Sequence, residues 1–285
     1  MQTSENAAES AIRNILYTTD LSLAAERALP YAREIARCYG SRLYAVHVRE
    51  QGTDALVPTG TAKETAQEGL AQRERTKDLE ELLLGIIHEI IFLSGRVCQT
   101  LITFIQEKRM DLVVFSTQGR TGFDNVKFGS VAVDIFWRAP CPALIVGPAV
   151  SITPKENVAL HRILYATDFS AESLAAAPHA ISLARQHHAQ PILLHVIQGG
   201  ADVPAMLHTL RRLLPFGTEL QSEPDCVVEH GAPTSKILEV ADRRRADLIV
   251  LGVHATKGRL QKQFARSGIF KIITQAKCPV LTVRS

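Results

Sequence analysis

Short apolar runs alternate with longer amphipathic stretches along the first half of the chain. The apolar runs are rich in β-branched residues and are bounded by turn residues, which is typical of buried strands. They predict strands at Ile15–Thr18, Leu43–Val48, Ile86–Leu93, Leu112–Phe115 and Ala143–Val146. Because the stretches between them show helical patterns, we expect a parallel sheet that is covered by helices on both faces.

Helix signals follow the first strand. Ser22 is predicted to cap the first helix at its N-terminus, and Gly40 is predicted to end it. Pro30 falls about two turns inside this helix, where proline removes a backbone hydrogen bond, so a kink or an early break is expected. Ser170 and Pro178 predict the same arrangement in the second half.

The chain also repeats itself. Residues 15–22, ILYTTDLS, match residues 163–170, ILYATDFS, at an offset of 148 positions. Further on the offset falls to 136, so the second copy lacks twelve residues, and it becomes 137 at Cys141 and Cys278. The deletion shortens the region of Thr61–Glu81, a long polar stretch that predicts a solvated helix in the first copy.

Length and repeat together predict two domains. At about 150 residues per domain, the 285 residues divide into 1–150 and 151–285, joined by a linker at Gly147–Leu160.

Composition and charge exclude several classes of protein. Hydrophobic residues make up 46% and charged residues 21%, which excludes disordered and collagen-like classes. The net charge of +3 is too small for a surface built throughout to bind nucleic acid. Residues 1–150 carry 16 basic and 18 acidic side chains (−2), and residues 151–285 carry 16 and 11 (+5).

Candidate chemistry follows the fourth strand of the first copy. Ser116-Thr117-Gln118-Gly119 is followed, nine residues later, by Gly129-Ser130-Val131 at a predicted helix start. Free backbone N–H groups at a helix N-terminus suit a phosphate, and glycine lets the backbone approach it closely. Asp20 and Val48 follow or close two other strands at the same edge of the sheet, where they could contact the ribose and the purine of a nucleotide.

These residues carry a resemblance to a known family. The runs ILYTTDLS, HV, DLVVFSTQGRTGFDNVKFGSVAVDI and APCPALIV resemble the universal stress protein domain, and the repeat is similar to its tandem members. The resemblance covers about residues 12–147 and 160–284. It implies two tandem Rossmann-like (adenine nucleotide alpha-hydrolase-like) domains, each a five-stranded parallel sheet between helices. It also implies a pseudo-dimer within one chain, paired through the last strands around Ala143–Val146 and Val280–Val283.

The resemblance also implies an ATP site in the first domain. In nucleotide-binding members the phosphate loop reads G-x-x-G, nine residues, G-[S/T], and its spacing is met here. The backbone amides of the loop would bind the phosphates, together with the Ser130 hydroxyl, and Mg²⁺ is left open. Ser116 departs from the pattern because it replaces the first glycine, where its Cβ could obstruct close approach or need an unfavourable φ. The implied residues are Thr19, Asp20 and Val48 for adenosine, and Ser116, Gly119, Gly129, Ser130 and Val131 for the phosphates.

The second copy departs further from this pattern. Gly252 is kept, but Ala255 replaces Gly119, and Ala265-Arg266 or Arg266-Ser267 replaces Gly-Ser, so we expect a degenerate loop. No acidic residue occurs from Leu248 to Ser285. The basic residues of this stretch form either a solvated helix face or an anion or polyanion site. They are Lys257, Arg259, Lys262, Arg266, Lys271, Lys277 and Arg284.

The remaining reactive residues give weaker signals. Cys141 and Cys278 each precede a proline before a last strand and are interpreted as small buried hydrophobic residues. Eight of the ten histidines lie in the second half, among them His187-His188. None has a convincing ligand spacing with a carboxylate partner, so we expect surface or helix-end histidines and no metal site.

The sequence therefore favours a cytoplasmic stress-response protein that binds ATP in its first domain and acts as a sensor or scaffold rather than an enzyme. The N-terminal residues lack the basic-then-apolar order of a signal peptide. The alternative is an interaction protein that binds no nucleotide and meets RNA or a protein through Lys257, Arg259, Lys262 and Arg266. A slow ATP hydrolase is a third interpretation, although no base is apparent. Homodimerisation of the whole chain is left open.

Overall fold

The computed structural model describes residues 11–50, 73–118, 128–200, 202–213, 220–254 and 267–284. Strands alternate with helices in both halves of the chain. The first half contains β1 (Asn14–Thr18), α1 (Leu23–Glu26), α2 (Leu29–Tyr39), β2 (Arg42–Arg49), β3 (His88–Ser94), α4 (Val97–Glu107), β4 (Leu112–Ser116), α5 (Ser130–Arg138) and β5 (Ala143–Val146). The second half contains β6 (Arg162–Ala166), α6 (Ala171–Ala175), α7 (Ala177–Gln186), β7 (Gln190–Ile197), α8 (Val203–Arg211), β8 (Asp225–His230), α9 (Pro233–Arg243), β9 (Leu248–Val253), α11 (Gly268–Gln275) and β10 (Val280–Arg284).

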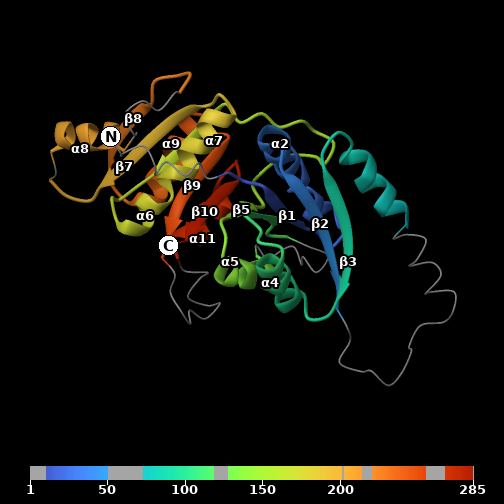
Figure 1. Ribbon diagram of the computed structural model, residues 1–285. Helices are drawn as coiled ribbons and strands as arrows, with labels where there is room; N and C mark the ends of the chain where they lie inside the picture. The colour runs from blue at the N-terminus through green and yellow to red at the C-terminus, as the bar shows by residue number, and fades with distance from the viewer. Residues whose placement is uncertain are drawn as a thin grey trace, which may run out of the picture.

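The strands form one ten-stranded sheet in the order β3-β2-β1-β4-β5-β10-β9-β6-β7-β8, so β3 and β8 lie at opposite ends (Figure 1). Neighbours within each half are parallel, whereas β5 and β10 are antiparallel, with Leu281 opposite Leu144. The predicted pairing of the last strands is confirmed. The two five-stranded parallel sheets therefore join into one mixed sheet at this β5–β10 seam.

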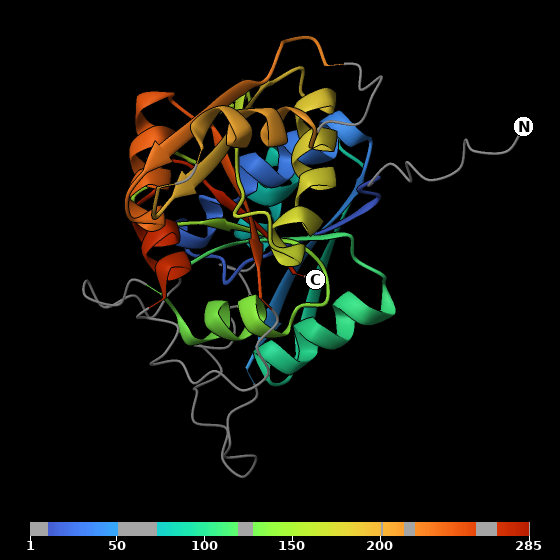
Figure 2. The same ribbon diagram turned by 90° about the vertical axis from the view of Figure 1, so that its left-hand side faces the viewer.

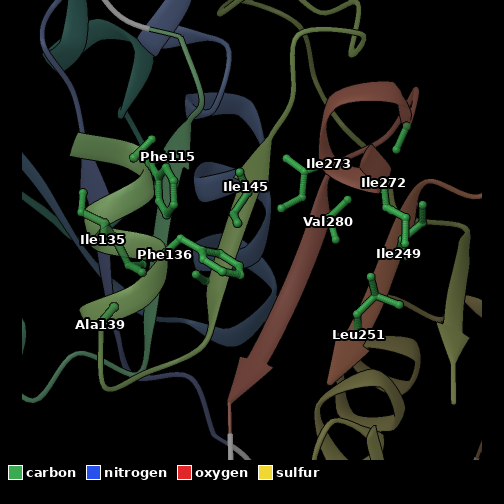
Figure 3. Packing of buried hydrophobic residues seen from close by; sticks show 14 of the residues in the cluster. Phe115, Ile135, Phe136, Ala139, Ile145, Ile249, Leu251, Ile272, Ile273 and Val280 are labelled. Carbon is green, nitrogen blue, oxygen red and sulfur yellow. The ribbon is translucent and has the colours of Figure 1, made fainter. Parts of the chain in front are cut away.

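Helices cover both faces of the sheet, and each face has a continuous core. One core contains residues of α4, α5, α9 and α11, and the other contains residues of α2, α7 and α8. Figure 3 shows the first core crossing the seam, where Phe136 and Ile145 of the first half lie near Ile273 and Val280 of the second. On the opposite face α2 lies beside α7 (Figure 2). Both cores therefore join the two halves.

The helix starts follow the predicted signals. The Oγ atoms of Ser22 and Ser170 accept hydrogen bonds from backbone N–H groups in the first turns of α1 and α6. Pro30 and Pro178 stand in the first turns of α2 and α7, so the expected early break lies between two helices. Gly40 ends α2 in the left-handed conformation, at φ 64°.

Two predicted elements differ from the structure. The third strand begins at His88 rather than Ile86, because the backbone N–H of Ile86 donates to Leu83 in the turn before it. Of the polar stretch Thr61–Glu81, the structure describes a helix over residues 73–82. This helix is not fully solvated, because Leu79 is buried, as is Leu83 just beyond it, and the spacing of four places both on one face.

The linker between the halves runs along α2. Arg27 and Arg33 donate hydrogen bonds to the linker carbonyls of Pro148 and Pro154, at 3.3 and 3.4 Å. Val150 and Leu160 bury their side chains in the α2 and α7 core. The connection is thus packed on the first half before β6 begins. Within the described residues, every helix falls short of the length and apolarity needed to cross a bilayer.

Candidate functional site

The repeated Thr-Asp-x-Ser motif builds the loop after the first strand of each half. In the first half, the Thr19 Oγ1 accepts from the Leu21 N–H at 2.9 Å, and the Asp20 Oδ1 accepts from the Ser22 N–H at 3.0 Å. The His47 Nδ1 lies 2.9 Å from the Thr19 carbonyl oxygen and fixes the loop to β2. These bonds hold Leu21 at a positive φ of 63°, so the repeated residues have a structural role independent of any ligand.

The second half reproduces this loop with the same bonds. Thr167 and Asp168 accept from the N–H groups of Phe169 and Ser170, at 2.9 and 3.0 Å, and Phe169 has a φ of 63°. Burial opposes ionisation of Asp168, but hydrogen bonds from Ser170 outweigh it and lower the pKa of the carboxyl. The Asp168 side chain is therefore a carboxylate at neutral pH.

The predicted residues of the first half gather around one cavity of about 180 Å³ at the carboxyl ends of the strands. Thr19 and Asp20 come from the loop after β1, Val48 from β2, and Ser116 from the end of β4. Gly129, Ser130 and Val131 come from the start of α5 and line the same cavity. Gly119 lies outside the described residues.

The N-terminus of α5 faces this cavity without a side-chain cap. Gly129 occupies the N-cap position, and Ser130 at the first helical position is exposed. Among the described residues, a Cβ on Gly129 would meet the Thr117 carbonyl oxygen, at 3.6 Å, which is ordinary contact. The N–H groups of the first turn and the positive end of the helix dipole are therefore available to an anion.

Sequence reasoning did not single out Thr117, which also lines the cavity. Its side chain is buried, and within the described part of the chain its Oγ1 has no hydrogen-bond partner. A buried hydroxyl without a partner costs stability, so it points to a group that the described residues do not supply. The sequence did contain one signal for Thr117, because it directly follows the apolar run of β4, at the end of the sheet where ligands bind.

Ser116 is accommodated without strain. It is absent from the described residues with positive φ, so the serine needs no unfavourable backbone conformation. The equivalent Gly252 is required for packing, because a Cβ there would lie 2.0 Å from the Glu172 carbonyl oxygen of α6. Helix packing therefore explains the first glycine of the motif in the second half, whereas the first half accommodates a serine at this position.

The cavity of the second half is larger, at about 540 Å³, although its loop is degenerate in sequence. Gly268 lines it at the position equivalent to Val131, on the offset of 137 set by the two Cys-Pro pairs. A Cβ on Gly268 would lie 2.6 Å from the Thr234 Oγ1 of α9, so a larger residue would not fit there without displacing that side chain. The size of this cavity was not predicted from the sequence.

The second cavity is poorly suited to an anion. The Oγ of Ser267 accepts from the Phe270 N–H at 3.3 Å and caps α11, so one N–H that is open in α5 is already bonded here. Asp168 and Glu172 line the wall, and Glu172 contacts the His254 Nδ1 at 2.5 Å. Carboxylates on the cavity wall oppose the binding of a polyphosphate by like-charge repulsion.

The structure describes only part of the basic run of the second half, so the choice between a solvated helix face and an anion site stays open for the rest. Lys257, Arg259, Lys262 and Arg266 lie outside the described residues. Lys277 pairs with Asp242 at 2.6 Å. Arg284 is turned into the seam, where its guanidinium donates to backbone carbonyls at the C-terminal end of α5.

Burial sets the protonation of two cysteines and the surroundings of one histidine. It raises the pKa of the Cys141 and Cys278 thiols to about 12, so both are protonated at neutral pH, and Cys278 is buried as expected. His187 lies at the end of α7, in agreement with the expected helix-end histidines, but it is buried against a carboxylate. Its side chain is 1% exposed and its Nδ1 lies 3.4 Å from the Glu34 carboxylate of α2. The partner lies in the other half and is therefore not visible in sequence spacing.

Comparison with known proteins agrees with this geometry. The model of the universal stress protein family matches residues 11–147, 159–209 and 218–284. A universal stress protein of Methanocaldococcus jannaschii is 28% identical over 142 residues, covering 48% of this chain and 84% of that protein. One of Thermus aquaticus is 31% identical over 134 residues, covering 43% and 97%. The crystal structure of a universal stress protein from Archaeoglobus fulgidus superposes with a TM-score of 0.75 at 18% identity, covering 96% of this chain and 97% of that one.

Proposed function

Because the chain belongs to the universal stress protein family, we propose that it binds one ATP molecule in its first half and acts in the cytoplasm as a sensor or scaffold. The observation that carries the proposal is the single cavity around which the described candidate residues gather, at the uncapped start of α5. The second half contributes the paired framework, since its self-capped helix and two carboxylates disfavour a triphosphate.

The cavity size suggests how the ligand lies. About 180 Å³ is below the ~300–1,000 Å³ of pockets that enclose a whole drug-sized molecule. We place the adenosine inside, between Val48 and the Thr19-Asp20 loop. The phosphates then lie at the mouth, on the N–H groups at the start of α5 and on the exposed Ser130 hydroxyl.

The described residues favour binding over turnover. Asp20 is the one ionisable side chain of the described cavity wall, and its Oδ1 already accepts from the Ser22 N–H. Phosphoryl transfer to water needs an oriented water and stabilisation of developing charge, usually with Mg²⁺. One carboxylate engaged in its own loop is a poor base, so the proposed role is non-enzymatic.

The test is the adenine nucleotide content of freshly purified, acid-quenched protein, with three variants at Gly129. We expect near one ATP per chain in the wild type and in Gly129→Ala, because the added Cβ has room. Gly129→Asp should carry almost none, because a carboxylate would cap α5 and repel the phosphates.

Gly129→Asn is the matched control for charge. It caps the helix as aspartate does but is neutral, so its nucleotide content should lie between those of the alanine and aspartate variants. Absence of nucleotide in the wild type, together with no thermal shift on adding Mg·ATP, would overturn the proposal. Equal nucleotide content in the alanine and aspartate variants would show that the phosphates do not bind at the start of α5.

A further inference from the structure

A compact group of ligand-type side chains lies where α2 of the first half meets the end of α7 of the second. Within the described residues, one ligand atom each from Glu34, Cys38 and His187 lies within 4.8 Å of the others. Glu34 and Cys38 are four positions apart and share one face of α2. His187 directly follows α7, so neither half contains the group by itself.

The Glu34 Oε1 is the centre of this group. It lies 3.3 Å from the Cys38 Sγ and 3.4 Å from the His187 Nδ1. In a tetrahedral zinc site with ordinary bond lengths, neighbouring ligand atoms are about 3.4–3.6 Å apart. These two separations are therefore close to those of a zinc site, and the ligand atoms of Cys38 and His187 lie within 4.8 Å of each other.

His187 is buried without the hydrogen bonds that a buried imidazole normally makes. Its side chain is 1% exposed, and among the described residues its Nε2 has no partner. The approach of Nδ1 to Glu34 is long, at 3.4 Å. An ion held together with Glu34 and Cys38 would bond the Nδ1 atom in place of this long contact, and the Nε2 atom would keep no partner among the described residues.

The symmetry-related contact provides an internal comparison. On the offset of 148, Tyr39 is equivalent to His187, and Ser182 to Glu34. The Tyr39 hydroxyl and the Ser182 Oγ form an ordinary hydrogen bond of 2.9 Å. One copy of this helix contact is thus satisfied by neutral groups, whereas the other carries a thiol, an imidazole and a carboxylate.

We propose that Glu34, Cys38 and His187 form a site for a borderline-soft divalent cation, Zn²⁺ in the first place, which ties the two halves together. A thiol, an imidazole and a carboxylate are the ligands of this class, and three of them leave a fourth position for water. The Glu34 side chain is 11% exposed and Cys38 is half-buried, so an ion can approach from the side of Cys38.

Two features of the site oppose the binding of an ion and lower the affinity of the site for it. Burial, followed by the hydrogen bond to Glu34, raises the pKa of the Cys38 thiol to about 11, so an ion must displace a proton. Arg37 pairs with the Glu34 Oε1 at 2.9 Å and competes for it. The Arg37 side chain is 65% exposed and can move into solvent.

The experiment uses the full chain, treated with a chelator under reducing conditions and titrated with Co²⁺ and then with Zn²⁺. We expect one Co²⁺ per chain with a thiolate-to-cobalt charge-transfer band, which Zn²⁺ abolishes. Cys38→Ser should lose the charge-transfer band. Its affinity for Co²⁺ should fall by at least roughly 10- to 100-fold, which is the loss seen when a residue that only supports a metal ligand is replaced. Cys226→Ser, on β8 at a half-buried thiol, should keep both.

Arg37→Ala keeps the test decisive if a ligand variant fails to fold. Because Arg37 competes for Glu34 from the surface, its removal should tighten Co²⁺ binding about two- to fivefold, as expected from an exposed ion pair. No charge-transfer band at one equivalent, a band that survives in Cys38→Ser, or unchanged or weaker binding by Arg37→Ala would each overturn the proposal.

Discussion

Gly147→Ala is expected to destabilise the protein by about 2–3 kcal/mol, the upper range for overpacking a buried site. Gly147 directly follows β5 at the seam, and a Cβ there would lie 1.9 Å from the Ile273 carbonyl oxygen of α11. A helix carbonyl cannot turn aside as a flexible side chain can, so α11 or β5 must shift. Urea unfolding measures the loss of free energy.

Gly199→Ala is the control for this substitution. Within the part of the chain that the structure describes, the same methyl group there meets nothing within 4 Å, and Gly199 has no positive φ. Its stability should therefore stay within about 0.5 kcal/mol of the wild type. A Gly147→Ala protein as stable as Gly199→Ala would show that the seam is not packed as tightly as the structure describes.

Arg284→Met should cost about 2–3 kcal/mol, because it leaves the end of α5 without its donor. The Arg284 guanidinium donates to the carbonyls of Phe136, Trp137 and Ala139 across the seam. It also lies 5.7 and 5.8 Å from the ring centres of Phe136 and Trp137. Charged hydrogen bonds are worth about 1.5–3 kcal/mol, and cations favour a helix C-terminus.

Trp137 is the sole tryptophan, so its fluorescence follows the seam during urea unfolding. Arg284→Lys is the matched variant. It keeps the charge but lacks the planar fork that reaches several carbonyls, so it should recover only part of the loss. Equal stability of the methionine variant and the wild type would contradict the assignment of Arg284 as a seam residue.

Positions 147 and 284 are equivalent on the offset of 137, as are Phe136 and Ile273. One side of the seam therefore meets the facing helix carbonyl with a glycine, and the other with an arginine. Pairing two first halves would lose the arginine, and pairing two second halves would lose the glycine. The seam thus favours pairing of unlike halves.

Local features were predictable from the sequence because they depend on neighbouring residues. The caps at Ser22 and Ser170, the breaks before Pro30 and Pro178, and the stop at Gly40 follow from bonds within a few positions. The pairing of β5 with β10 was predicted from the family resemblance and is confirmed.

Features that depend on distant residues were not predictable. The close approach of Gly252 to Glu172 spans 80 positions, and that of His187 to Glu34 spans 153. The basic run suggested a surface role for Arg284, whereas the fold brings α5 against it. Residue type and periodicity report which face is buried, but they do not report which carbonyl or carboxylate lies opposite.

The linker along α2 has a consequence for how the halves associate. Its carbonyls at Pro148 and Pro154 accept hydrogen bonds from Arg27 and Arg33, so the connection is partly fixed and its effective length is reduced. A short tether gives two binding partners an effective local concentration in the millimolar range or above. The seam should therefore form at any dilution, whereas two separate single-domain chains would dissociate as their concentration falls.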